Sequence, residues 1–206
     1  MKPRVVEVDW LIGTRRLSEF SPLALISKKL KIRWVMLWEG YTYGPTPGIT
    51  EALDLLITVL KPKSVLDLFC GSGALSKLAY SKGVKKIVSV DLYPDAALRN
   101  LRRCRGVKVV GGDALSYQPG ERFDLIVADP PEELIEKLLE NLGRLRELFR
   151  LGALIWLGPY QRAERNIMLL RGRRMVRTLE AWGDALAVLW KPGLGSRIAS
   201  ALRLLE

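Results

Sequence analysis

Four acidic residues follow apolar segments at positions where they could share one ligand site. Asp67 lies in VLDLFCGSGALS (65–76), four residues before the first glycine of a G-S-G turn. Asp91 follows that glycine by twenty residues, and Asp113 and Asp129 end two later apolar segments. The carboxyl ends of parallel strands meet at one edge of a sheet, where open α/β sheets bind their ligands. The spacing therefore predicts a single site built from these four side chains.

The turn formed by Gly71, Ser72 and Gly73 lets the backbone approach a ligand closely, because glycine has no Cβ. Dinucleotide-binding turns are similar, but the strand before them is apolar and the helix N-terminus after them takes a pyrophosphate. Asp67 places a carboxylate in that strand. A carboxylate repels phosphate and attracts a cation, so we expect a cationic ligand without phosphate.

The next two acids complete a nucleoside site. Asp91 ends an apolar run and can accept hydrogen bonds from both hydroxyls of a ribose. Its alternative role is a helix cap before Pro94. Asp113, in GGDAL, can accept from an adenine amine, or it can be a turn residue or N-cap. Together these acids predict a nucleoside that carries a positive group.

Asp129, Pro130 and Pro131 form a second kind of site. Two prolines fix the backbone and remove two N–H donors, which leaves the Asp129 carboxylate and the Pro130 carbonyl as acceptors. A planar NH2 group could donate to both, and its nitrogen would then be oriented for reaction. The alternative is a plain strand end followed by a helix start.

Composition limits the chemistry and suggests a partner. The chain has 206 residues, 33 Lys and Arg against 22 Asp and Glu, and a net charge of +11. Such a balance favours polyanions, although a source rich in basic residues would give the same value. With no His, no imidazole can act as a general base or metal ligand. The two cysteines make neither a metal cluster nor a disulfide framework, so we expect a cytoplasmic setting; zero His and only two Gln hint at a heat-adapted source.

Periodicity predicts a doubly wound, mostly parallel α/β sheet of the Rossmann-like kind with a C-terminal antiparallel hairpin. We expect a basic N-terminal extension over 1–45, with a strand at 33–40, a main domain over 46–193 and a tail helix within 194–206. The expected strands are 65–69, 86–91, 107–113, 123–131, 153–158, 175–182 and 184–190. The expected helices are 49–60 with Thr46 or Thr50 as N-cap, 74–83, 94–104, 132–150 and 160–171. No apolar run is long enough for a membrane helix.

The motifs VLDLFCGSGALS, DLYPDA, GDAL and FDLIVADPP resemble, in this order, those of class I S-adenosylmethionine-dependent methyltransferases. The resemblance covers roughly residues 46–191 and implies seven strands, S-adenosyl-L-methionine as cofactor and no metal. It implies three sets of cofactor contacts. Asp67 and the loop of Phe69, Cys70, Gly71, Ser72 and Gly73 would hold the methionine end; Asp91 would hold the ribose, with Leu92 and Tyr93 beside the adenine; Asp113 and Ala114 would bind the adenine edge.

Within this class, Asp-Pro-Pro resembles the signature of enzymes that methylate amino groups of adenine or guanine. The most similar type is the bacterial small-subunit rRNA guanine-N2 methyltransferase, and PTPGITEAL (45–53) is similar to its entry into the first helix. One residue departs from the pattern, because Glu132 stands where an aromatic would stack on the base. Tyr93, Tyr117 or Tyr160 could provide a ring instead.

The sequence thus predicts a methyltransferase acting on a base amino nitrogen in structured RNA, either rRNA or tRNA. Basic clusters near residues 28–33, 99–105 and 162–177 fit an RNA surface. Three alternatives remain open: a methyltransferase for a protein or small molecule, a non-catalytic RNA-binding protein with this fold, and an aminopropyl-type transferase. Cys70 is interpreted as a small residue of the cofactor loop and not as a nucleophile, and Cys104 as structural. Oligomeric state is not predicted.

Overall fold

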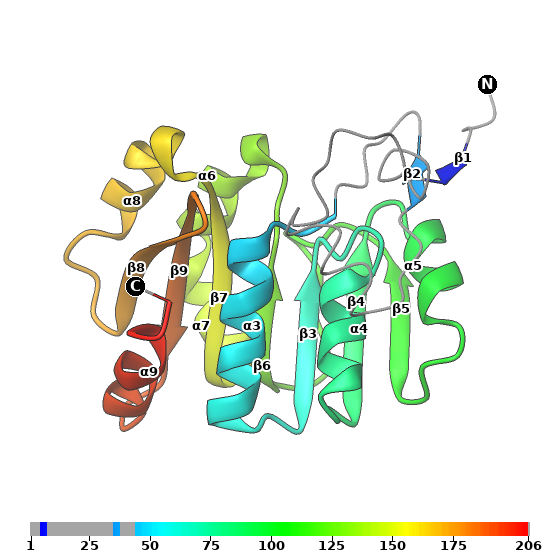
Figure 1. Ribbon diagram of the computed structural model, residues 1–206, viewed down its shortest axis with the longest axis horizontal. Helices are drawn as coiled ribbons and strands as arrows, with labels where there is room; N and C mark the ends of the chain where they lie inside the picture. The colour runs from blue at the N-terminus through cyan, green and yellow to red at the C-terminus, as the bar shows by residue number, and fades with distance from the viewer. Residues whose placement is uncertain (1–4, 8–34, 38–43, 206) are drawn as a thin grey trace.

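The computed structural model of the chain describes residues 5–7, 35–37 and 44–205, and its centre is one seven-stranded sheet (Figure 1). A separate antiparallel pair joins β1 (Val5–Glu7) to β2 (Val35–Leu37). The strand expected at 33–40 overlaps β2, and its remaining residues, like the basic cluster at 28–33, lie outside the described residues. The strands of the main sheet are β3 (Ser64–Leu68), β4 (Lys86–Asp91), β5 (Val107–Gly111), β6 (Phe123–Ala128), β7 (Phe149–Pro159), β8 (Val176–Ala181) and β9 (Asp184–Trp190).

The order of the strands across the sheet is β5-β4-β3-β6-β7-β9-β8. The first five of these strands are parallel, and β9 pairs antiparallel with both β7 and β8. The predicted doubly wound sheet with a closing hairpin is therefore confirmed. After β3 the chain builds outward to β5 and then returns to the other side of β3 with β6. This reversal creates a crevice at the carboxyl ends of β3 and β6, where such folds bind ligands.

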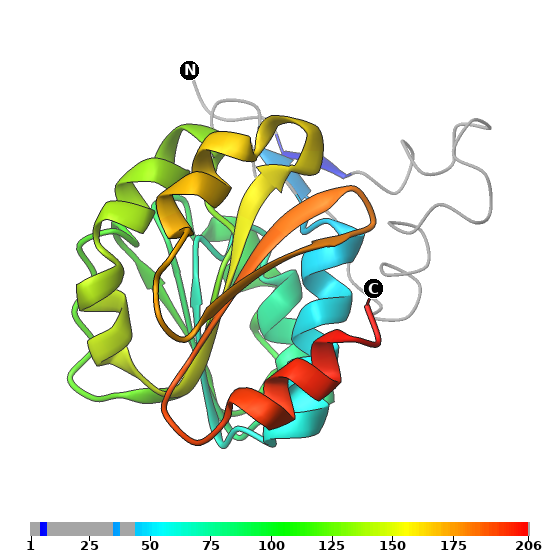
Figure 2. The same cartoon turned by 90° about the vertical axis from the view of Figure 1, so that its left-hand side faces the viewer.

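Helices cover both faces of the sheet, as the edge-on view in Figure 2 shows. One buried apolar cluster lies under α3, α4 and α9, and a second lies under α6, α7 and α8 on the opposite face. The α-helices described are α3 (Pro47–Leu60), α4 (Ala74–Ser81), α5 (Asp95–Leu101), α6 (Glu132–Glu140), α7 (Leu142–Leu148), α8 (Glu164–Leu170) and α9 (Gly195–Leu202). The tail helix expected within 194–206 corresponds to α9.

Two of the expected helices are wrong in extent. The helix expected over 132–150 is broken at Asn141 (φ −95°, ψ 21°), which separates α6 from α7, and β7 already begins at Phe149. The apolar spacing continues across the break, because Leu138 and Leu142 are both buried, so periodicity could not reveal it. The helix expected over 160–171 is a 3-10 turn, Tyr160–Arg162, followed by α8.

The start of α3 packs unusually closely against the hairpin of β8 and β9. Thr46 is at the N-cap position but makes no side-chain cap; instead the Thr50 hydroxyl donates to the Thr46 carbonyl, 2.7 Å away. The Gly48 N–H donates to the Asp184 carboxylate at 3.2 Å. A Cβ on Gly48 would lie 2.3 Å from the Ala181 carbonyl oxygen and 2.6 Å from Asp184 Oδ2. Glycine is therefore required at this contact.

We expect Gly48→Ala to lower the free energy of unfolding by about 2–3 kcal/mol, because the backbone of the hairpin would have to move. Gly143→Ala is the matched control: Gly143 is also helical, and a Cβ there meets nothing within 4 Å. That change should raise stability by up to about 1 kcal/mol, as alanine favours helix. Urea unfolding of both variants measures the two effects. Equal stability of the two variants would contradict the close packing at Gly48.

Candidate functional site

A pocket of about 760 Å³ opens at the carboxyl edge of the sheet, over the crevice between β3 and β6. Two groups of residues line it, and we name them by their most characteristic members. The glycine half consists of Phe69, Cys70, Gly71, Leu75, Asp91, Leu92, Tyr93, Asp113 and Ala114. The proline half consists of Gly44, Pro45, Thr46, Asp129, Pro130, Pro131, Glu132, Glu133, Leu134 and Trp156. Most of the predicted site residues are thus brought together in one pocket.

The turn between β3 and α4 is held in a demanding conformation. Phe69 has a positive φ of 61°, a conformation that costs free energy for an aromatic residue. Strained backbone conformations of this kind are concentrated at functional sites. Gly73, with φ 81°, could not be replaced easily, since a Cβ would lie 2.7 Å from Leu101 Cδ1. The Cys70 N–H donates to the Val90 carbonyl at 3.0 Å, which ties the turn to β4. The turn is therefore rigid in the shape that lines the pocket.

Asp91 sits at the end of β4, where it both shapes the turn and faces the pocket. Its Oδ2 accepts the Gly71 N–H at 2.7 Å, and its Oδ1 accepts the Tyr93 N–H at 2.9 Å. Each carboxylate oxygen has more than one lone pair. Acceptor capacity remains for two ligand hydroxyls, as the ribose assignment requires.

Asp67 lies beneath the turn, and its side chain is fully buried. Its Oδ2 accepts from the N–H and hydroxyl of Ser76, at 3.0 and 2.6 Å, while its Oδ1 has no partner among the described residues. Burial raises the pKa of Asp67 to about 7, against the lowering effect of the Ser76 bonds. Asp67, Ser72 and Gly73 do not belong to the pocket lining. A buried carboxyl oxygen without a partner is costly unless a ligand compensates it.

Asp113 is exposed at the rim of the glycine half. It accepts from the Leu115 N–H at 2.9 Å and from the Ser116 hydroxyl at 2.8 Å, and these bonds, the Leu115 bond foremost, hold its pKa below the usual range. The interpretation of Asp113 as a turn residue is confirmed. The same turn leaves its carboxylate beside Ala114, a buried residue that also lines the pocket.

The proline half begins where β6 ends. The Asp129 N–H donates to the Leu68 carbonyl at 3.3 Å, which holds the Asp129 backbone next to β3. Pro130 is buried, and Pro131 occupies the N-cap position of α6. The prolines thus end a strand and start a helix, and they also form part of the pocket. Desolvation raises the pKa of Asp129 to about 8, and the negative charges of Asp67 and Asp184 add to the rise.

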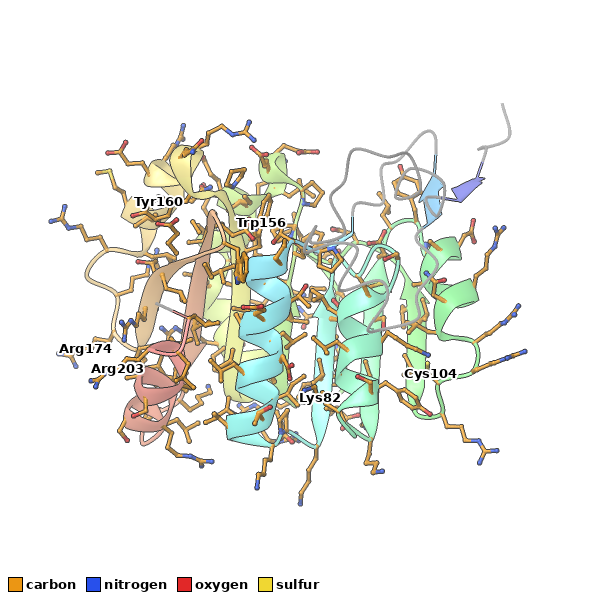
Figure 3. All side chains as sticks on the ribbon, viewed as in Figure 1. Lys82, Cys104, Trp156, Tyr160, Arg174 and Arg203 are labelled. Atoms are coloured by element: carbon orange, nitrogen blue, oxygen red, sulfur yellow. The ribbon has the colours of Figure 1, made fainter. Side chains whose placement is uncertain are left out.

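The structure brings in two residues that the sequence did not indicate. Trp156, on β7, lines the proline half, and its Nε1 donates to Asp184 Oδ1 at 3.0 Å (Figure 3). Asp184 is 6% exposed and also accepts the Gly48 N–H. ALIWLG predicts a strand, and a tryptophan within it looks like an ordinary core residue. Only the sheet order reveals that β7 neighbours β6 and brings Trp156 to the pocket.

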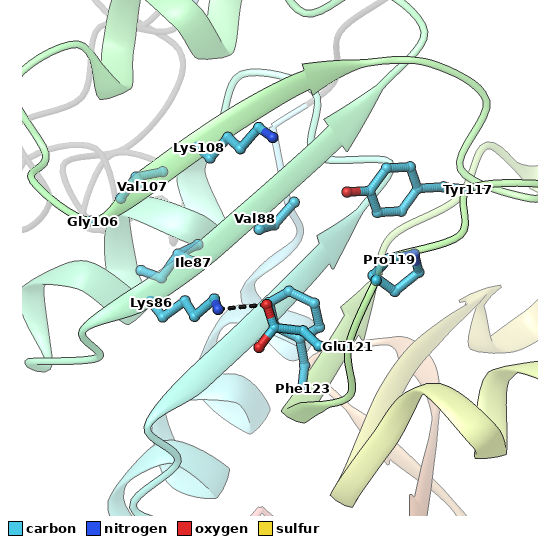
Figure 4. Close-up of a pocket in the computed structure, with 11 residues that line it drawn as sticks. Lys86, Ile87, Val88, Gly106, Val107, Lys108, Tyr117, Pro119, Glu121 and Phe123 are labelled. Atoms are coloured by element: carbon cyan, nitrogen blue, oxygen red, sulfur yellow. Dashed lines mark hydrogen bonds and ion pairs between the residues drawn. The ribbon is translucent and has the colours of Figure 1, made fainter.

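Glu132 lies at the mouth of the proline half, and Arg162 donates to its carboxylate at 2.9 Å. Of the three tyrosines proposed to replace an aromatic at this position, Tyr93 lines the pocket, in its glycine half. Tyr117 instead borders a separate hollow of about 460 Å³, with Lys86, Lys108 and Phe123, where an ion pair joins Lys86 to Glu121 (Figure 4). Apart from Tyr117, this hollow contains none of the residues predicted for the site.

Both cysteines are buried and free. Burial raises the pKa of Cys70 well above its ordinary value, and the charges of Asp67 and Asp91 act in the same direction. A thiol of this kind is a poor nucleophile, which supports the interpretation of Cys70 as a small loop residue. Cys104 packs beside Leu101 and accepts from the Lys77 ammonium at 3.2 Å. Within the described ranges, no group of candidate ligands could hold a metal, and no helix is long and apolar enough to cross a membrane.

The glycine half fits a cationic nucleoside. Asp91 keeps acceptors for two hydroxyls, Asp113 offers a carboxylate at the rim of the pocket, and the orphaned oxygen of Asp67 lies below the turn. S-adenosylmethionine has these features. Two curated proteins and one solved structure support that class.

A ribosomal protein L11 methyltransferase from Colwellia psychrerythraea is 33% identical over 53% of this chain and 41% of its own length. An uncharacterized RNA methyltransferase from Clostridium acetobutylicum is 28% identical over 52% of this chain and 25% of its own. The N-methyltransferase NodS from Bradyrhizobium japonicum WM9, solved with S-adenosyl-L-homocysteine, has a TM-score of 0.53 and 17% identity, over 70% of this chain and 85% of that one. The chain thus spans less than half the length of these two curated relatives.

Fold and site together define the chain as a member of the class I S-adenosylmethionine-dependent methyltransferases, with S-adenosylmethionine as the cofactor of that class. The class and cofactor predicted from the motifs are confirmed. Within this class the chain belongs to the family described as Conserved hypothetical protein 95, whose model matches residues 24–164.

Proposed function

We propose that the protein transfers a methyl group from S-adenosylmethionine to an exocyclic amino nitrogen of a base in structured RNA. The observation that carries this proposal is the position of Asp129 and Pro130 in the same pocket as Asp91 and the glycine turn. An acceptor pair made of a carboxylate and a carbonyl suits a planar NH2 group. The net charge of +11 favours a polyanionic substrate, and one of the relatives is named an RNA methyltransferase.

In this proposal each side chain has a definite task. The bound cofactor supplies a methyl group on a positively charged sulfur. Asp129 and the Pro130 carbonyl each accept one N–H of the amino group, which turns the nitrogen lone pair toward that methyl. Transfer would form the new N–C bond and leave the electron pair of the broken S–C bond on the neutral sulfur of S-adenosylhomocysteine. The nitrogen then releases a proton to water, since the chain has no His to receive it. Orientation of this kind can supply several kcal/mol.

A second candidate function is methylation of a protein. It is favoured by Glu132 and Glu133, two acidic residues in the proline half that would suit a cationic substrate, and by the relative named a ribosomal protein L11 methyltransferase. Glu132 is already neutralised by Arg162 at 2.9 Å, however, which reduces this attraction.

A transfer assay tests the proposed function. Radiolabelled S-adenosylmethionine is incubated with the protein and, in separate reactions, with total RNA, total protein and small metabolites from cells that lack this protein. We expect label in RNA, and digestion to nucleosides should place it on a base amino group. Label in protein alone would favour the second candidate, and absence of label from RNA would reject the first.

Asp67, which is fully buried, and Asp129, which is half-buried, lead to a prediction about pH. The pKa values of Asp67 and Asp129 are raised to about 7 and 8, so both carboxyls are largely neutral at lower pH. A cationic ligand prefers an ionised carboxyl close to it, so binding of the cofactor above the glycine turn should release protons mainly from Asp67. We expect affinity for S-adenosylmethionine to rise about tenfold between about pH 6 and pH 9, as measured by calorimetry. The product, S-adenosylhomocysteine, has a neutral sulfur and is the control; equal pH dependence for both ligands would refute this coupling.

A further inference from the structure

The proline half is the part of the pocket where the proposed substrate would bind, and it contains a large side chain, Trp156, to which the proposed reaction gives no role. Among the described residues that line this half, Trp156 is the only aromatic one. Glu132, at the position where related motifs have a stacking ring, extends into an ion pair with Arg162. A base held by Asp129 and Pro130 needs an apolar wall, because hydrogen bonds at its edge do not fix the tilt of its plane.

Trp156 is held by bonds from two other elements. Its Nε1 donates to Asp184 Oδ1 at 3.0 Å, and Asp184 Oδ2 accepts the Gly48 N–H at 3.2 Å. The carboxylate thus joins β7, β9 and the start of α3 while it is almost fully buried. The start of α3 lies close to this carboxylate, since a Cβ on Gly48 would be 2.6 Å from Asp184 Oδ2. Since Nε1 is its one polar atom, the rest of the half-buried indole presents carbon to its surroundings.

The Asp184 carboxylate also interacts electrostatically with Asp129, which would hold the substrate amino group. The charge of Asp184 contributes to the raised pKa of Asp129. Ala128 pairs with Ile155 in the parallel register of β6 and β7, so the residues that follow them, Asp129 and Trp156, lie side by side. The indole that binds Asp184 and the carboxyl that would hold the amino group therefore belong to one corner of the pocket. Figure 3 shows Trp156 at the upper end of the sheet, beside the start of α3. Residues 44–46 complete this corner.

We propose that Trp156 is the stacking wall for the target base, in place of the aromatic that Glu132 replaces, and that Asp184 fixes the plane of its ring. This inference rests on the proposed function, since it assumes a planar acceptor in the proline half. Stacking of a base on an aromatic ring contributes about 1–3 kcal/mol, which corresponds to a loss of about 5–150-fold in kcat/KM on removal of the ring.

The test compares variants of the full chain on the RNA that the wild-type protein labels. Trp156→Leu removes the ring and should lower kcat/KM for RNA about 5–150-fold, mainly through KM. Trp156→Phe keeps a ring without the bond to Asp184 and should recover most of that loss. Affinity for S-adenosylmethionine, measured by calorimetry, should stay within about twofold in both. Trp190→Leu is the matched control, because Trp190 is half-buried and lies on β9 near the amino end of β7.

Each outcome has a distinct meaning. If the wild-type protein labels no RNA, the proposed function fails and the inference fails with it. If it labels RNA and Trp156→Leu retains its kcat/KM, the inference alone fails. Parallel loss of cofactor affinity and RNA methylation would show that Trp156 only supports the fold, which also overturns the inference. Should Trp156→Leu not fold, Trp156→Met preserves volume without a ring and must show the same contrast with Trp156→Phe.

Discussion

Asp129→Ala is expected to lower kcat by about 10³-fold while affinity for S-adenosylmethionine changes little. The carboxylate is one of two acceptors proposed for the amino group, and the other, the Pro130 carbonyl, cannot hold the nitrogen alone. Binding of the cofactor depends mainly on the glycine half, which keeps its contacts in this variant. Single-turnover methylation of RNA measures the first effect, and calorimetry the second.

Two further variants make this prediction specific. Asp129→Asn keeps an oxygen acceptor but loses the charge, so we expect an intermediate rate and a weaker rise of activity with pH. Asp124→Asn is the matched control, since Asp124 lies at the start of β6, the strand that Asp129 directly follows, and accepts the Lys63 N–H there at 2.7 Å. Its activity should equal that of the wild-type protein. A wild-type rate in Asp129→Ala would show that Asp129 does not orient the amino group for methyl transfer.

The raised pKa of Asp129 fixes the direction of the pH effect. Burial and the neighbouring acids favour the protonated form below about pH 8. The ionised form is the better acceptor of an N–H, so kcat/KM for RNA should increase as pH rises toward that value, because this ratio reports on the enzyme before it binds the RNA. In Asp129→Asn the part of the pH dependence that arises from ionisation of Asp129 should disappear. Any remaining pH dependence then belongs to Asp67.

The sheet and its ligand edge could be predicted because their signals are local. Asp67, Asp91 and Asp129 each stand at or near the end of an apolar strand, and the βα alternation aligns those ends at one edge. The sequence could not predict which strands pair with each other after the βα alternation ends at β7. Trp156 and Asp184 meet only because β9 inserts between β7 and β8. That pairing is a long-range contact with no periodic signal in the chain.

Asp113 illustrates a different limit. Its two roles, turn residue and ligand contact, use the same carboxylate, and the sequence could not separate them. The structure confirms the turn, through the bonds to Leu115 and Ser116, and leaves the contact with adenine as a prediction. Asn141 illustrates a third limit, because the backbone break there leaves the apolar spacing of α6 and α7 intact.

Asp91→Ala is expected to weaken binding of S-adenosylmethionine by about 100-fold. The carboxylate has two duties, since it accepts the Gly71 and Tyr93 N–H groups and would accept the ribose hydroxyls. Hydrogen bonds to a charged group contribute about 1.5–3 kcal/mol each, and removal also frees the glycine turn. Calorimetric titration with the cofactor measures the loss.

Asp95→Ala is the matched control for this change. Asp95 is an exposed acid in the first turn of α5, four residues after Asp91, so it contributes similar long-range charge without touching the pocket lining. Its affinity for the cofactor should stay within about twofold of the wild-type value, because exposed charges are screened. Comparable losses of cofactor affinity in both variants would show that net charge causes the effect and would contradict a ribose contact by Asp91. Loss of affinity in Asp91→Ala alone, in a variant that remains folded, assigns the effect to the Asp91 carboxylate, through the ribose contact together with the turn that this carboxylate holds.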